Sequence, residues 1–156
     1  MTTPRTQRVP VPERIGTTKD SERAGYRTAV RLNGGPSLSP EQWARGTFER
    51  APSIVRYMLL LGWRLAFRLR LGSRTSAGTV LGWYVTESSA DLATVSAGSK
   101  LLEAQHHFLR DSDGIVWVTL VRAHTRAGRL VWRAIAPMHE LSMPLLLRWA
   151  ARHPGV

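Results

Sequence analysis

The sequence has no cysteine among its 156 residues. Disulfide bonds and zinc sites with cysteine ligands are therefore excluded, and this composition suits a reducing compartment such as the cytoplasm. The N-terminus has no apolar core of the kind that a secretory signal requires, so we do not expect export by that route. The apolar run at residues 57–63 is far shorter than the roughly 20 residues that a membrane-spanning helix needs. We therefore expect a cytoplasmic protein.

Acidic residues are scarce as well, with 11 Asp and Glu against 22 Lys and Arg and a formal net charge of +11. Only Lys19 and Lys100 are lysines, so arginine carries nearly all of the positive charge. Such a balance favours anionic partners, among them membranes, nucleic acids and acidic ligands. It is also typical of an arginine-rich bacterial proteome in which arginine is the default surface cation. The sequence has no nucleic-acid-binding motif, so we expect no specific nucleic-acid partner.

Motifs of catalysis are missing too. The chain has no glycine-rich phosphate loop, no nucleophile elbow and no pair of acids at a useful spacing. His106 and His107 are adjacent in an expected strand and point to opposite faces, so they cannot bind one metal ion together. His106 and His124 lie on neighbouring expected strands, but no acidic residue stands clearly beside them. The sequence therefore indicates no metal and no cofactor, and it leaves open whether the protein is an enzyme, with a non-enzymatic role favoured.

The length and the hydrophobic content of 43% suit one globular domain. Residues 1–24 are polar, with prolines at positions 4, 10 and 12, and they lack regular periodicity. We expect this segment to be a flexible or surface-draped arm. Residues 25–156 are then the single domain.

Within that domain, residues 25–32 alternate in polarity and predict a first strand. Ser39, Pro40 and Gln42 form a helix start with a capping box, and this helix must break at Pro52. A second helix is expected from Ile54 to about residue 71. Four further runs rich in β-branched and aromatic residues then predict strands at residues 79–87, 92–97, 100–110 and 115–126. The turns between them are so short that the strands must form an antiparallel meander.

The C-terminal segment, residues 128–153, predicts a long helix with a broad apolar face. Pro137 and Pro144 lie seven residues apart on its flank, and each removes one helix hydrogen bond and bends the axis. A bent helix following a curved sheet is the favoured interpretation. A break into two shorter helices at Pro137 is the alternative.

This order of elements resembles the helix-grip fold of the START-like superfamily, also called SRPBCC or polyketide cyclase-like. The segment GRLVWRAIAPMH also resembles the terminal motif of a bacterial family of unknown function in that superfamily, which reads Gly-Arg and then Pro-Phe-His. Gly128, Arg129, Pro137 and His139 match this motif, and Met138 stands where phenylalanine is usual. The resemblance implies an α+β fold in which a curved antiparallel sheet carries two helices after the first strand. It also implies that the long C-terminal helix packs across the sheet, with a cavity between them.

We therefore expect a protein that holds a small apolar or lipid-like ligand in this cavity. An inward His106 would supply a polar group there, with His107 facing solvent, and His139 lies at the edge of the apolar helix face. Each candidate also has a purely structural interpretation as a core residue or a helix tie. The alternative function is a cyclase-type or isomerase-type enzyme that uses a cavity histidine. The cavity candidates are Trp83, His106, Phe108, Trp117, Trp132, Ile135, Met138 and His139.

The helix expected at residues 54–71 has one apolar face and one mixed face. At 100° per residue, one face carries Ile54, Met58, Leu61, Leu65 and Leu69, and we expect it to pack on the core. The other face combines leucine and aromatic residues with arginines. It suits a surface covered by the arm or by another subunit, which would make a homo-oligomer. It also suits contact with anionic lipid at the inner membrane. The anionic-surface candidates are Arg56, Arg64, Arg68 and Arg70.

Overall fold

The structure is a computed structural model that describes residues 3–155. Its strands are β1 (Arg5–Val9), β2 (Tyr26–Asn33), β3 (Thr79–Val80), β4 (Trp83–Ser88), β5 (Leu92–Gly98), β6 (Leu102–Asp111) and β7 (Gly114–Ala123). Its helices are α1 (Glu13–Gly16), α2 (Lys19–Arg23), α3 (Pro40–Phe48), α4 (Ser53–Leu65) and α5 (Arg126–Arg152). The protein is therefore of the α+β class, as the sequence predicted.

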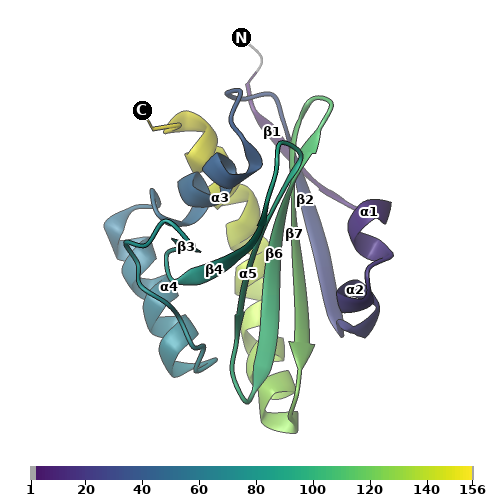
Figure 1. Cartoon of the computed structure of the whole chain (residues 1–156), viewed down its shortest axis with the longest axis vertical. Helices are drawn as coiled ribbons and strands as arrows, with labels where there is room; N and C mark the ends of the chain where they lie inside the picture. Colours follow the sequence, from purple (N-terminus) through teal and green to yellow (C-terminus); the bar gives the residue numbers. More distant parts are fainter. Residues whose placement is uncertain (1–2, 156) are drawn as a thin grey trace.

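The strands form one curved, open antiparallel sheet in the order β1-β2-β7-β6-β5-β4-β3. Strands β3 to β7 follow one another as the expected meander, and β2 pairs with β7 along its whole length. The long helix α5 crosses one face of the sheet, with α3 and α4 beside it (Figure 1). The predicted arrangement of a sheet, two helices and a C-terminal helix laid across the sheet is confirmed.

Both faces of the sheet are covered, but by different parts of the chain. The inner face meets α3 and α5 in a large core that includes Trp43, Phe48, Phe108 and Trp117. The outer face carries a smaller apolar cluster in which Ile15 of α1 packs over residues of β5, β6 and β7. The inner face therefore forms the floor beneath α5, where the candidate site lies.

The N-terminal segment, expected as a flexible or surface-draped arm, takes part in the sheet. β1 pairs with β2 from Arg5 opposite Asn33 to Val9 opposite Ala29. The short helices α1 and α2 then lie over the outer face (Figure 1). Strand β1 was not predicted from the sequence.

Helix α3 begins with the predicted capping box. The Ser39 hydroxyl accepts from the Gln42 backbone N–H at 3.1 Å, and the Gln42 side-chain oxygen accepts from the Ser39 N–H at 2.8 Å. These two bonds satisfy backbone donors that a helix start otherwise leaves unpaired.

Helix α5 continues through both prolines, so one long helix is the correct interpretation. The Thr125 hydroxyl caps it by accepting from the Gly128 N–H at 2.9 Å. Gly128 lies against the turn between β5 and β6 so closely that a Cβ atom would stand 2.1 Å from the Leu101 carbonyl oxygen. This contact explains why the Gly-Arg motif has glycine at its first position.

Helix α4 is shorter than predicted, and its buried face is the opposite one. It ends at Leu65, and Arg68 follows with a φ of 54° that lies outside the helical region. Trp63 and Phe67 are buried, whereas Ile54 is 65% and Leu65 is 69% exposed. The expectation that the Ile54 face packs on the core is therefore wrong within the helix, and of that predicted face Leu69, which follows α4, is buried. Aromatic side chains on the other face fill the core instead.

Among the described residues, the structure contains no helix with the length and apolar character needed to cross a membrane.

Candidate ligand-binding site

Two histidines and a threonine meet between the sheet and α5. His106 is on β6, Thr119 is directly opposite it on β7, and His139 is on the facing side of α5. The Thr119 hydroxyl lies 3.1 Å from His106 Nδ1 and 2.9 Å from His139 Nε2. One hydroxyl therefore joins both imidazoles, and the two rings lie 5.8 Å apart between centroids. We call these three residues the histidine cluster.

The contacts of His106 determine which of its ring nitrogens carries the proton. The Trp117 indole N–H donates to His106 Nδ1 at 3.0 Å. An indole can only donate, so Nδ1 must be the acceptor, and in the neutral ring the proton is on Nε2. Among the described residues, Nε2 has no hydrogen-bond partner.

Both imidazoles are neutral at pH 7. Burial lowers the pKa of His106 well below its usual 6.5, and the nearby His139 and His107 lower it further. Burial also lowers the pKa of His139 to about 4, against the opposite influence of Glu140. With these pKa values the cluster binds and orients polar groups well but is a weak general base at neutral pH.

Aromatic rings enclose the histidine cluster. The Trp83 ring lies 4.6 Å and the Phe48 ring 5.1 Å from the His106 ring, and Trp132 lies 5.4 Å from His139. The indole N–H groups of Trp83 and Trp132 are buried and have no hydrogen-bond partner. Buried donors without a partner are rare in folded proteins and commonly mark the place of a water or ligand. The walls of the site therefore present unpaired donors together with apolar surface.

A groove of about 500 Å³ opens beside Trp132. It lies between the start of β2, the end of β7 and the first half of α5. Tyr26 packs edge-on against Trp132 at 4.9 Å, and its hydroxyl donates to Glu140 at 2.8 Å. Because the Trp132 ring has the groove on one side and His139 on the other, it separates the groove from the histidine cluster.

Most of the predicted cavity residues lie around the histidine cluster. Trp83, His106, Phe108 and Trp117 are buried on the inner face of the sheet. His139, Trp132 and Ile135 are partly buried on the side of α5 that faces the sheet.

Met138 was predicted to line the cavity, and this prediction is wrong. Its side chain is 67% exposed and cannot line an interior cavity. At this point of α5 the neighbouring His139 takes the inward position. Thr119 and Phe48, which were not among the predicted site residues, also lie at the histidine cluster. Thr119 alternates in β7 with Trp117 and Val121, so the strand period placed it on the same face.

His107 does not face solvent as expected. It is buried on the outer face of the sheet, where its Nδ1 lies 2.8 Å from the Thr94 hydroxyl and its Nε2 3.0 Å from the Gln105 side-chain oxygen. Burial lowers its pKa to about 4, with a smaller opposing influence from Asp20.

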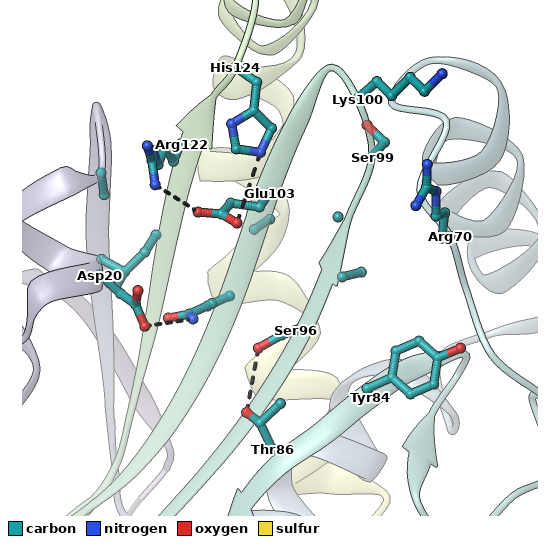
Figure 2. A pocket seen from close by; sticks show the side chains of 16 residues that line it. Asp20, Arg70, Tyr84, Thr86, Ser96, Ser99, Lys100, Glu103, Arg122 and His124 are labelled. Atoms are coloured by element: carbon teal, nitrogen blue, oxygen red, sulfur yellow. Dashed lines mark hydrogen bonds and ion pairs between the residues drawn. The ribbon is translucent and has the colours of Figure 1, made fainter.

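The four anionic-surface candidates are not on one helix face. Arg56 is partly buried and donates to the Glu49 carbonyl at 3.1 Å, and Arg64 is exposed near the end of α4. Arg68 and Arg70 follow the helix in the extended link. Figure 2 shows Arg70 at the margin of a polar groove on the sheet face opposite α5.

That outer groove is wide, and its charged side chains partly pair with one another. Glu103 lies 3.6 Å from Arg122 and 3.9 Å from His124 (Figure 2). Its wall consists of ordinary polar side chains on the part of the outer face that α1 and α2 leave open, so it is a weaker candidate than the histidine cluster. Within residues 3–155, no group of three or more histidine or acidic side chains is placed to hold a metal ion.

A comparison with protein-family models gave one match, over residues 25–145, to a family described as Protein of unknown function (DUF2867). Searches of the curated proteins and of the solved structures gave no match.

Proposed function

Because the chain belongs to the DUF2867 family, whose description assigns no activity, we propose a function from the site itself: the protein binds a small apolar molecule between the sheet and α5. The observation that carries this proposal is the set of unpaired donors around the histidine cluster. Trp83 and Trp132 each offer a buried indole N–H, and His106 offers Nε2–H. The acceptor oxygen of a ligand would pair with these donors, and its apolar body would pack against the aromatic side chains around the histidine cluster.

The fold supports this proposal, and on the same grounds we propose that the protein belongs to the START-like superfamily. The curved antiparallel sheet faces a long C-terminal helix, and the Gly128, Pro137 and His139 positions of the motif lie on that helix. His139 of this motif contacts Thr119, so the motif helps to build the proposed site.

Native mass spectrometry of the protein purified from the organism that encodes it tests the proposal. We expect a retained small molecule at a ratio of one per chain, released when the protein is unfolded in organic solvent. The variant Trp132→Phe removes one donor and keeps an aromatic ring, so the retained fraction should fall. Trp149→Phe is the matched control, because Trp149 donates to the Arg50 carbonyl at 2.7 Å, away from the site. A bare wild-type chain, or equal loss in both variants, would refute the proposal.

A second candidate function is peripheral attachment to an anionic membrane through α4. Ile54, Tyr57, Met58, Leu61 and Leu65 are all exposed large apolar side chains of this one helix. Residues 53–74 contain five arginines and no acidic residue. An apolar helix face bordered by cations alone suits the interface of an anionic bilayer, and a second copy of a chain with net charge +11 would be repelled.

Co-sedimentation with vesicles tests this attachment. The chain should bind vesicles containing 30% phosphatidylserine, and binding should weaken with salt and in Leu61→Gln/Leu65→Gln. Leu141→Gln/Leu145→Gln changes two exposed leucines of α5 instead and serves as the control. Equal binding to neutral phosphatidylcholine vesicles, or none to either kind, would eliminate the candidate.

A further inference from the structure

The groove beside Trp132 has an excess of positive charge. Four arginines line it, and Glu140 is the only acidic residue among the lining residues that the structure describes. The arginines come from three different elements or their ends and converge on one opening: Arg23 of α2, Arg122 of β7, and Arg129 and Arg133 of α5.

Glu140 does not neutralise this charge, because it already has partners. Arg8 lies 2.9 Å from one of its carboxylate oxygens, and the Tyr26 hydroxyl donates to the other at 2.8 Å. Hydrogen bonds from Arg8 and then Tyr26 lower the pKa of Glu140, so it stays ionised and held in place.

Most of the arginines have no such partner. Arg122 lies 3.6 Å from Glu103, which is a loose contact at the surface. Arg23, Arg129 and Arg133 form no ion pair with any carboxylate in residues 3–155. Three exposed guanidinium groups therefore surround the groove with their hydrogen-bonding forks free.

The groove also has aromatic lining residues. Trp132 and Tyr26 meet edge-on there, and the other neighbour of the Trp132 ring is His139 of the histidine cluster. Arg129 and Arg133 are one helical turn apart on α5, so both can reach one small group above Trp132. Guanidinium groups bind oxyanions in paired, charge-assisted hydrogen bonds.

We propose that this groove is the head-group subsite for an amphipathic anion. Arg129 and Arg133 hold a compact oxyanion such as a carboxylate, and Arg23 and Arg122 add to the attractive field. The apolar body extends past Trp132 toward His139, and an oxygen acceptor on that body pairs with the buried donors there. This inference rests on the proposed function, and it names the class of ligand that the interior site receives.

Two probes with the same chain and different head groups test it. 12-Hydroxydodecanoate and 1,12-dodecanediol, each below its micelle or solubility limit, are titrated into the full chain at low salt and followed by tryptophan fluorescence. The hydroxy acid should bind at least about tenfold more tightly than the diol, as expected for one charge-assisted contact. This preference should disappear in 0.5 M sodium chloride, because salt screens exposed charges.

The double variant Arg129→Gln/Arg133→Gln should bind both probes equally. Arg126→Gln/Arg152→Gln removes the same charge from the same helix outside the groove and should keep the preference. Equal wild-type affinity for the two probes, or equal loss in both double variants, would overturn the subsite and leave the interior site standing. Failure of both probes to bind would overturn the subsite together with the proposed function.

Discussion

The buried histidines should make the protein lose stability as the solution becomes mildly acidic. Burial lowers the pKa values of His107 and His139 to about 4 and that of His106 well below 6.5. In the unfolded chain these side chains titrate near 6.5. Between these values the unfolded chain binds protons that the folded chain does not bind, so the free energy of unfolding falls as the pH falls from about 6.5 toward 4.

The magnitude follows from the two pKa values. A histidine that titrates at about 4 when folded and at 6.5 when unfolded costs about 2 kcal/mol of stability at pH 5 relative to pH 7.5. His107 and His139 together should then remove about 4 kcal/mol, and His106 adds to this loss. A loss of this size is a large part of the roughly 5–15 kcal/mol that stabilises an ordinary domain.

Urea unfolding at pH 7.5 and at pH 5.0, followed by tryptophan fluorescence at constant ionic strength, measures this loss. In His107→Gln the difference between the two pH values should shrink by about 2 kcal/mol. Glutamine retains hydrogen-bonding capacity toward Thr94, and position 107 lies on the opposite sheet face from the proposed ligand site. If the wild-type stability is the same at both pH values, or if the variant shows the wild-type difference, burial does not hold these rings neutral.

Two further predictions concern local structure. Gly128→Ala should destabilise the protein by about 2 kcal/mol in urea unfolding, because its Cβ would collide with the Leu101 carbonyl. Gly62→Ala in α4, where a Cβ meets nothing within 4 Å, should instead stabilise it by about 1 kcal/mol, and a gain at both positions would contradict the collision. Ser39→Ala should lower stability by about 1 kcal/mol because the Gln42 N–H loses its acceptor; an unchanged midpoint of thermal unfolding would show that water replaces this cap.

Most of the fold could be predicted because short-range signals determine it. Turn residues separate the meander strands, so their pairing needed no knowledge of distant contacts. The Ser39 capping box marked the start of α3 in sequence and in structure. Strand β1 gave no such signal, because its side chains are mostly exposed and polar and only backbone pairing with β2 makes it a strand.

The site was harder to predict because it depends on which face of each element is buried. Both faces of β7 are apolar, since helices cover one face and the N-terminal segment covers the other. A period of two residues cannot choose between two covered faces. The same covering explains why His107 is buried. Helix α4 also carries apolar side chains on both faces, so its period could not show that Trp63 and not Ile54 packs on the core. His106 and His139 were found from their types, but the Thr119 hydroxyl that joins them needed the register of β6 against β7.

The two edges of the sheet have a consequence for the behaviour of the chain at high concentration. An uncovered edge strand offers unpaired backbone groups to another molecule and so promotes aggregation. Here one edge is β3, only two residues long and followed by Leu81 and Gly82 with positive φ, which leaves little to pair with. The other edge is β1, where exposed Arg5 and Arg8 place like charges on any approaching copy. The N-terminal strand therefore also protects the protein from edge-to-edge assembly, and its removal would expose the longer β2 in its place.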